Sequence, residues 1–202
     1  AIFFAIISSA SIILLAITLD SFSPIIYYSL IILLSWSYSQ KPLQFSYHRL
    51  GEVIIFLLFG PALVMGGYFI QTRIFPAPES FSLSLPFGFL TTAVLFANEV
   101  PDLTDDAKVR KFTWAGLLTR QRAFVLYWLL VSFAFLSILL NIALGYLNIF
   151  ALSALIFISP ALKAAGILRK FPDDKARLIE SSKLTVAVQA LVGIILIVAV
   201  LL

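Results

Sequence analysis

The sequence predicts an all-α membrane protein, a bundle of helices that crosses the bilayer several times. Its 202 residues are 61% hydrophobic and 12% charged, and its mean hydropathy is +1.06, whereas an ordinary soluble domain is about one quarter charged. Apolar runs of about 17–25 residues, the length at which a helix crosses a hydrocarbon core of roughly 30 Å, recur along the chain. The strands of a membrane barrel would instead alternate polar and apolar residues over about ten positions.

Seven apolar segments give the helices that we expect in this single domain, 1–202. Their approximate bounds are 2–19, 23–38, 50–71, 84–100, 122–144, 147–168 and 184–202. In the third segment the Gly60-Pro61 pair predicts a kink, because proline removes a donor from the helical ladder. Ala1 lies inside an apolar run without the basic region or the small-residue cleavage site of a signal peptide. We therefore expect that a portion of the natural protein precedes Ala1.

The basic residues predict the orientation of the bundle. All of the 14 Lys and Arg residues except Arg73 fall in connections on one side of the predicted membrane, and most of the acids share that side. The positive-inside rule assigns this side to the cytoplasm, or to the equivalent compartment of an organelle. We expect an integral, multi-pass protein of a bacterial inner membrane or an organellar membrane. Its partner is the lipid bilayer, and no nucleic-acid partner is expected.

An acidic cluster followed directly by a basic cluster stands at the end of the fourth apolar segment. Asp102 and Asp106 are four residues apart, so in a helix their carboxylates share one face, with about 5–6 Å between the Cβ atoms. Two oxygen ligands at this spacing suit Mg²⁺, which binds one or two protein carboxylates and is completed by waters and substrate phosphates. Lys108, Arg110 and Lys111 follow at once and are candidates to hold those phosphates.

The end of the second apolar segment carries further candidates. Tyr38 is either an interfacial anchor or a substrate contact, since aromatic belts are common at membrane surfaces. Taken one at a time, Lys41 and Arg49 are explained by the positive-inside rule alone. A functional role for them depends on whether they face the acidic cluster. Glu52 either pairs with Arg49 or lines a polar cavity. The sequence leaves these alternatives open.

Other polar residues have simpler interpretations. Asp173 and Asp174 follow Pro172 and suit the start of a helix, where they cap free backbone donors and interact with the helix dipole. We favour this capping role over metal binding. The chain has one histidine, His48, and no cysteine, which excludes disulfides, thiolate metal sites and a histidine-based metal site within this chain.

The acidic cluster and the segment before it resemble those of a known family. Asn98, Asp102, Asp106 and Lys111 match the Asn, the two Asp and the Lys of the second aspartate-rich motif of the UbiA-type membrane prenyltransferases. The stretch 38–71 resembles the segment before and through the family's fifth helix. The resemblance covers roughly residues 30–125 and is greatest to the dihydroxynaphthoate polyprenyltransferases, which make menaquinone. Two motifs in the right order are more specific than either alone.

The resemblance implies a nine-helix fold of which seven helices are present here. The family's first aspartate motif would lie immediately before Ala1, and no such motif occurs among the 202 residues. Some residues depart from the family pattern. Arg110 stands where Gly is usual, Leu117 where an Arg is common, Thr119 where another Gly is common, and Lys41 replaces a frequent Pro.

The function that the resemblance implies is Mg²⁺-dependent transfer of a prenyl group from its diphosphate to an aromatic acceptor, of which a dihydroxynaphthoate-like quinone precursor is favoured. It assigns catalytic roles to Asp102, Asp106 and Lys111, with both aspartates as metal ligands. Substrate contacts fall to the remaining candidates, which are Asn98, Tyr38, Lys41, Lys108 and Arg49. The isoprenoid tail would lie in a cleft between apolar helices that is open to lipid.

Two other function classes compete with the enzyme. A non-catalytic member, retained as a structural or a quinone- or pigment-binding subunit of a larger membrane complex, would account for the absent first motif. A transporter would be expected to carry charged residues in the middle of its spans, where this sequence has little more than Asn141, Gln189 and hydroxyls. We rank the enzyme first, the subunit second and the transporter third.

Overall fold

A computed structural model describes residues 2–202, apart from the side chains of Ile2, Phe4, Ala5 and Arg120. Ala1, and the side chain of Arg120, which is one of the basic residues counted above, therefore lie outside the described part of the chain. The described residues form helices joined by short connections, as predicted. The α-helices are α1 (Ile2–Thr18), α2 (Ser23–Ser39), α3 (Gly51–Leu57), α4 (Leu63–Thr72), α5 (Pro78–Lys108), α6 (Trp114–Leu117), α7 (Ala123–Ala143), α8 (Ile158–Lys170) and α9 (Lys175–Leu201).

Among the described residues, five helical stretches are long and apolar enough to cross a membrane, which is consistent with a multi-pass integral membrane protein. They are Gly51–Thr72, Pro78–Lys108, Ala123–Ala143, Ile149–Lys170 and Lys175–Leu201. The first joins α3 to α4 through a π-helical turn, Leu58–Ala62, and the fourth begins with a 3₁₀ stretch, Ile149–Phe157, that leads into α8. Helices α1 and α2 are shorter, with 17 residues each.

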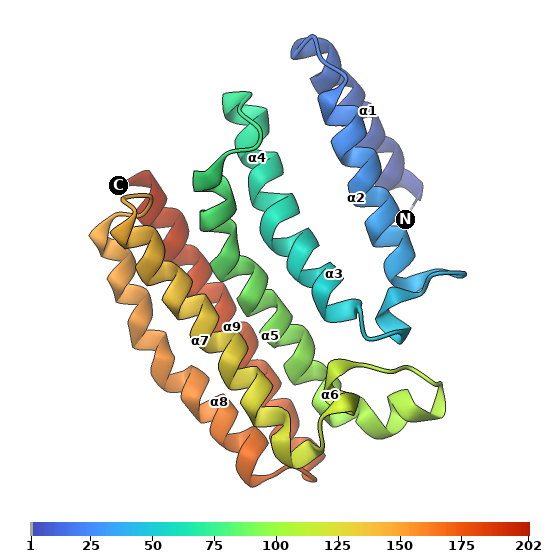
Figure 1. Cartoon of the computed structure of the whole chain (residues 1–202), viewed down its shortest axis with the longest axis vertical. Helices are drawn as coiled ribbons and strands as arrows, with labels where there is room; N and C mark the ends of the chain where they lie inside the picture. The colour runs from blue at the N-terminus through green and yellow to red at the C-terminus, as the bar shows by residue number, and fades with distance from the viewer. Residues whose placement is uncertain (1) are drawn as a thin grey trace.

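Helix α5 is the centre of the bundle. Figure 1 shows α7, α8 and α9 gathered on one side of α5, α3 and α4 on its other side, and the α1–α2 hairpin beyond them. The α5 side chains Leu90, Phe96 and Val100 are almost completely buried. Across the core the hydroxyls of Tyr127 in α7 and Thr185 in α9 are 2.9 Å apart.

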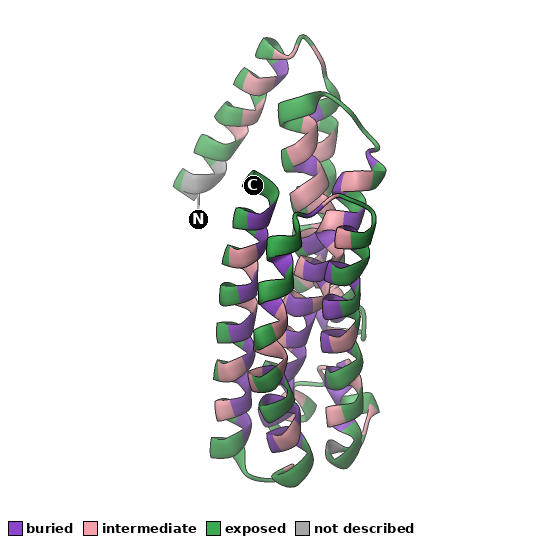
Figure 2. Cartoon of the chain, turned by 90° about the vertical axis from the view of Figure 1, so that its left-hand side faces the viewer, coloured by how far each residue is buried: buried purple, intermediate pink, exposed green. Residues whose placement is uncertain are grey.

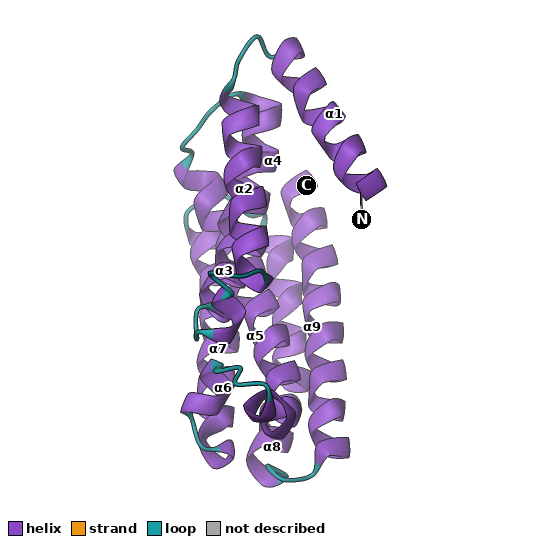
Figure 3. Ribbon diagram, turned by 90° about the vertical axis from the view of Figure 1, so that its right-hand side faces the viewer, coloured by secondary structure: helices purple, strands orange, loops and turns teal. Residues whose placement is uncertain are grey.

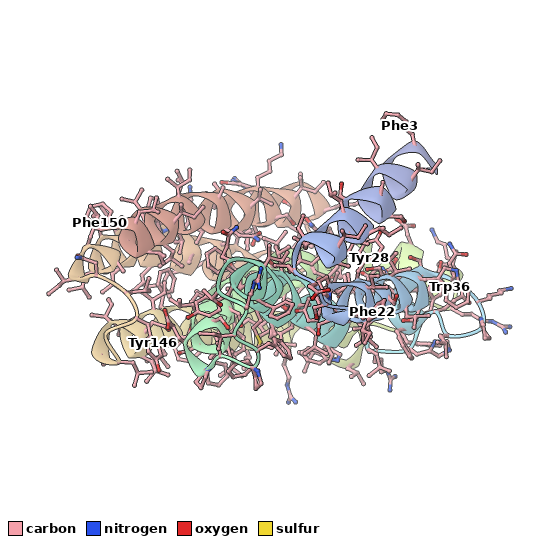
Figure 4. All side chains as sticks on the ribbon, turned by 90° about the horizontal axis from the view of Figure 1, so that it is seen from above. Phe3, Phe22, Tyr28, Trp36, Tyr146 and Phe150 are labelled. Carbon is pink, nitrogen blue, oxygen red and sulfur yellow. The ribbon has the colours of Figure 1, made fainter. Side chains whose placement is uncertain are left out.

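The outer surface of the bundle is apolar, as expected for a protein surrounded by lipid. In Figure 2 the buried residues form inward-facing stripes along the helices, while the outward faces are exposed. Large apolar side chains project from these faces, among them Phe22, Trp36 and Phe150 (Figure 4), which are 79%, 48% and 43% exposed. Apolar side chains therefore occur both in the core and on the outer surface, because lipid solvates apolar groups as well as the core does.

The polar connections lie at the two ends of the bundle. We call the end that carries connections 40–50, 109–122 and 171–174 the charged end; it lies in the lower half of Figures 1 and 3. Asp174 caps α9 there, since its Oδ1 accepts a hydrogen bond from the Arg177 backbone N–H (3.1 Å). This confirms the capping role expected for that residue.

Two predicted helices are longer in the structure than the sequence indicated. The segment 84–100 belongs to α5, which begins at Pro78 and ends at Lys108, and the segment 184–202 belongs to α9, which begins at Lys175. The predicted bounds were wrong because an apolar run marks where the hydrocarbon ends, whereas a helix continues into water as long as its charged residues pair along its surface. Arg177 and Glu180, at positions i and i+3, are such a pair.

The kink predicted at Gly60-Pro61 takes the form of the π-helical turn Leu58–Ala62. A wider turn accommodates the missing proline N–H. Gly60 also allows α5 to approach closely, because a Cβ atom at Gly60 would lie 2.9 Å from the Gly88 Cα atom. Small residues facing each other are a common means of close helix contact in membranes.

We predict that Gly60→Ala lowers the free energy of unfolding by about 1–3 kcal/mol, because the new methyl group meets backbone rather than a flexible side chain. The matched variant Gly67→Ala has no atom within 4 Å of its added Cβ and is expected to gain about 0.5–1 kcal/mol, since alanine is the better helix former. Unfolding in detergent measures both. Equal effects of the two substitutions would contradict the close contact.

Candidate functional site

The charged end of α5 finishes in a tight chain reversal. Arg110 adopts a left-handed φ of +55°. The Arg110 N–H donates to the Ala107 carbonyl (3.2 Å), and the Lys111 N–H donates to the Asp106 carbonyl (2.9 Å). These two bonds form a Schellman motif, which satisfies the last carbonyls of α5. The reversal turns Lys111 back over the final turn of the helix.

Lys111 is thereby paired with Asp106. Its Nζ lies 3.0 Å from Asp106 Oδ2, and both side chains are largely covered, with 23% and 16% of their surface exposed. Partial burial alone would lower the pKa of Lys111, but the hydrogen bond to Asp106 and the charges of Asp106 and Glu99 outweigh it and raise this pKa above its ordinary value. The ion pair therefore keeps the ammonium charged.

Asp102 engages a different partner. The Lys175 Nζ, at the start of α9, lies 3.3 Å from Asp102 Oδ1 and 3.3 Å from Asp105 Oδ2. Lys108 also pairs with Asp105, at 2.8 Å. The Asp102 side chain is 55% exposed, so a ligand from outside the chain can reach it. Asp102 and Asp106 lie one turn apart, as predicted, but one faces α9 and the other faces the segment after α5.

A groove of about 470 Å³ opens between α5 and α9 beside Asp102. Its lining residues are Asn98, Pro101, Asp102, Ile179, Ser182, Lys183 and Val186. The Ser182 hydroxyl donates to the Ala97 carbonyl at 2.8 Å and ties the two helices together. The groove thus combines an amide, a carboxylate and an ammonium with an apolar wall. That combination suits a ligand with an anionic head and an apolar tail.

The two segments that the sequence singled out lie side by side. The Arg49 N–H donates to the Phe112 carbonyl (2.9 Å), and the Phe112 N–H donates to the Tyr47 carbonyl (3.1 Å). The indole Nε1–H of Trp114 donates to the Arg49 carbonyl (2.9 Å). The Arg49 guanidinium lies 5.8 Å from the centre of the Phe112 ring. Backbone pairing therefore fixes the segment that carries Lys111 against the connection between α2 and α3.

Two buried acids support this segment from below. Glu52 of α3 and Glu99 of α5 are only 1% and 4% exposed, and their side chains lie within hydrogen-bonding distance of each other. Glu52 Oε1 accepts the Trp114 backbone N–H at 2.6 Å. The sequence left open whether Glu52 pairs with Arg49 or lines a polar cavity. Among the described residues, Glu52 does neither, because its partners are Trp114 and Glu99.

The remaining sequence candidates are spread over the charged end. Tyr38 is half-buried at the end of α2 and interacts electrostatically with Glu99 and Lys111, so it belongs to the same cluster. Lys41 is exposed in the turn after α2, and Lys108 is held by Asp105. Neither is joined to Lys111 by a contact recorded for the described residues. Three of the candidates, Tyr38, Asp106 and Lys111, thus lie together, while Lys41 and Lys108 stand apart from them.

Three residues of the site were not singled out as site residues from the sequence. Glu99 was hidden inside the motif that contains Asn98 and Asp102, and its burial could not be read from composition. Lys175 and Lys183 were counted only as charges of a connection, because α9 was expected to begin later. Their spacing of eight residues, close to two helical turns, is the signal that could have placed them on neighbouring parts of one helix face.

Comparison with known proteins identifies the relatives of this chain. The UbiA prenyltransferase family model matches residues 1–188. The chain is 32% identical over 104 residues to UbiA prenyltransferase domain-containing protein 1 of Dictyostelium discoideum, which covers 52% of this chain and 31% of that protein. It is 29% identical over 136 residues to 1,4-dihydroxy-2-naphthoate octaprenyltransferase of Mycobacterium tuberculosis, which covers 67% of this chain and 45% of that protein. The chain spans less than half the length of these relatives, and no solved structure gives a significant match.

We predict that Arg110→Gly raises the free energy of unfolding by about 1 kcal/mol, because glycine adopts the left-handed conformation without the steric penalty of a Cβ atom. The control Lys108→Gly, inside the last turn of α5, should lower it by about 1 kcal/mol. Chemical denaturation in detergent compares the two variants with the parent chain. A loss of stability in Arg110→Gly would mean that the Arg110 side chain, not its backbone, matters there.

We also predict that the Lys111–Asp106 pair stabilises the fold at neutral pH and that its contribution is lost in alkali. The pKa of Lys111 is raised in the folded chain, so its stabilisation is fully present below the unfolded pKa and disappears as the pH rises through the folded value. The difference in unfolding midpoint between the parent chain and Lys111→Met should therefore be constant near neutrality and shrink in alkali. A difference that grows with pH would contradict this sign.

Proposed function

Because the chain belongs to the UbiA prenyltransferase family, we propose that it transfers a prenyl group from a prenyl diphosphate to an aromatic acceptor. The observation that carries this proposal is the charged end of α5, where Asp102 and Asp106 stand one turn apart between two groups of lysines. Oxygen ligands flanked by ammonium groups suit a metal diphosphate.

The donor set at this end fits Mg²⁺. No group of three or more His, Cys, Asp or Glu side chains that could hold a metal occurs among the described residues, and Mg²⁺ needs only one or two protein carboxylates when phosphates complete its shell. We propose Asp102 and Asp106 as these ligands. Each now faces a lysine, so metal binding would exchange an ammonium group for the divalent ion and release that ammonium for phosphate oxygens.

The proposed reaction replaces the C1–O bond of the prenyl diphosphate and a C–H bond of the acceptor with a new C–C bond and a bond from the released proton to its acceptor. The C1–O bond of the prenyl diphosphate breaks, and its electron pair leaves with the diphosphate. A ring carbon of the acceptor bonds to C1 and then passes its proton to the released diphosphate or to water, which restores aromaticity. A bound metal would supply neutralisation of the charge that grows on the departing diphosphate. All further stabilisation has to come from the side chains of the chain.

Those side chains have distinct proposed roles. The ammonium groups of Lys183 and Lys111 would bind phosphate oxygens from the α9 side and from the opposite side, and the Asn98 amide would donate to one of them. The face of the Tyr38 ring would stabilise positive charge at C1. Lys41, Lys108 and Arg49 stand at the same end and would add to its positive field. The groove beside α9 would receive the start of the isoprenoid tail.

Our proposal for the aromatic acceptor is less specific than our proposal for the prenyl donor. One relative carries dihydroxynaphthoate in its name, while the Dictyostelium relative names no acceptor. A dihydroxynaphthoate-like ring, and so a part in menaquinone synthesis, is our first choice for the acceptor. The same proposal places the charged end on the cytoplasmic side, because nearly all basic residues gather there.

We predict that Asp102→Ala and Asp106→Ala each abolish Mg²⁺-dependent prenyl transfer in the complete encoded protein. The assay uses detergent-solubilised protein, Mg²⁺, labelled geranylgeranyl diphosphate and dihydroxynaphthoate. Loss of a ligand to a metal at the reacting diphosphate should lower the rate at least about 100-fold. A folded parent protein that gives no product with any aromatic acceptor would instead favour a non-catalytic subunit of a membrane complex.

We further predict that Lys183→Gln raises the KM for the prenyl diphosphate about tenfold, which corresponds to the loss of one charge-assisted hydrogen bond. Lys163→Gln is the matched control, because Lys163 is also exposed near the charged end but pairs with Glu180 on the outer side of α8 and α9. Its KM should not change. Equal effects of the two substitutions would indicate a long-range electrostatic effect on the diphosphate rather than a direct contact from Lys183 in the groove.

A further inference from the structure

The buried acids Glu52 and Glu99 have no part in the proposed chemistry and yet lie directly beneath it. Both are more than nine-tenths buried, and each has a buried Oε2 atom with no hydrogen-bond partner among the described residues. Their side chains lie within hydrogen-bonding distance of each other. Two carboxylates placed in this way would repel each other in a medium that screens charge poorly.

The groups packed around the pair do not remove this repulsion. Lys111, from the segment after α5, is the cation that interacts with Glu99, but it is already paired with Asp106. Tyr38, from α2, contributes a hydroxyl and no positive charge. A hydrogen bond between two carboxyl groups needs at least one proton, because two ionised carboxylates have only acceptors. A single shared proton would supply the donor for this bond and would leave one negative charge on the pair instead of two.

We infer that Glu52 and Glu99 hold one proton between them and that the pair positions Lys111. The contact that carries this role is the bond from the Trp114 N–H to Glu52 Oε1 (2.6 Å). It fixes one end of the short segment that contains Lys111, while the bond from the Lys111 N–H to the Asp106 carbonyl (2.9 Å) fixes the other. Glu52 stands on α3 and Glu99 on α5, so the pair also holds these two helices in register.

The inference rests on the proposed function only in its last step, that the positioned Lys111 binds diphosphate. The shared proton and the tie to Trp114 are properties of the fold and can be tested without any substrate. Glu52 and Glu99 are therefore positioning residues, which act through Lys111 and do not themselves touch the substrate.

Glutamine substitutions test the shared proton. Glutamine is nearly isosteric with a protonated glutamic acid and can donate to the remaining carboxylate, so Glu52→Gln and Glu99→Gln should each fold with nearly the parent's unfolding midpoint. Infrared difference spectra should show the carbonyl band of a protonated carboxylic acid, sensitive to D₂O, in the parent protein and not in either variant. Glu180→Gln, which alters an exposed carboxylate, is the control and should leave the band in place.

Hydrogen exchange and diphosphate binding test the positioning role. Exchange at the Trp114 amide should be slow in the parent and in Glu52→Gln, which retains an acceptor, and at least about tenfold faster in Glu52→Ala. Glu52→Ala should also weaken binding of inorganic diphosphate with Mg²⁺ about tenfold. In a Lys111→Met background the same substitution should have no further effect on binding, because coupled residues are not additive.

The outcomes separate the two ideas. A parent spectrum without the acid band, or a band that survives both glutamine variants, overturns the shared proton. Fast exchange at the Trp114 amide in the parent overturns the tie. Full additivity of Glu52→Ala and Lys111→Met overturns positioning through Lys111. If the parent fails to bind diphosphate although the band and the slow exchange are present, the proposed function fails while the carboxyl pair stands.

Discussion

The reversal of the chain after α5 is the constraint on which the rest of the site depends. Without the left-handed residue at Arg110, α5 would continue into water and Lys111 would point away from the bundle. With it, the backbone folds back, Lys111 reaches Asp106, and the next residues pair with the connection before α3. A lysine after a left-handed residue is thus a way of returning a cation to the helix that precedes it. The glycine usual in the family suits this position for the same backbone reason.

The helices beneath the reversal lie close together. Gly60 lets the α3–α4 span approach α5 at Gly88, and this approach allows Glu52 and Glu99 to meet beneath the Lys111 segment. Burying two acids is costly unless they are fully hydrogen-bonded. The fold accepts them here next to a backbone donor from Trp114, at the place where three segments have to be held in register. A buried polar contact therefore helps to fix the position of the Lys111 segment at the surface.

Much of this could be predicted from the sequence, and the limits have physical causes. The apolar runs predicted the five spans that the described residues form, together with the shorter helices α1 and α2. The Gly60-Pro61 pair predicted the kink, and the four-residue spacing of Asp102 and Asp106 predicted a shared face if their segment is helical. These features follow from local periodicity and backbone chemistry. The length of α5 and α9 could not be predicted, since hydropathy reports the membrane and not the helix. The Glu52–Glu99 contact and the groove lined by Lys183 depend on which helices pack together. Such long-range pairings leave no local pattern in a single sequence.

The position of the two aspartates on α5 explains how one helix end can contact both α9 and the Lys111 segment. Residues four apart in a helix are about 40° apart around its axis, so Asp102 and Asp106 share a face but diverge enough for one to meet α9 and the other the Lys111 segment. In the proposed reaction a metal diphosphate would lie over this helix end, between lysines from both sides. Each aspartate would then exchange its lysine for the metal without moving its backbone. The lysines would already be within reach of the phosphates, so the site needs side-chain rotation and not a movement of helices.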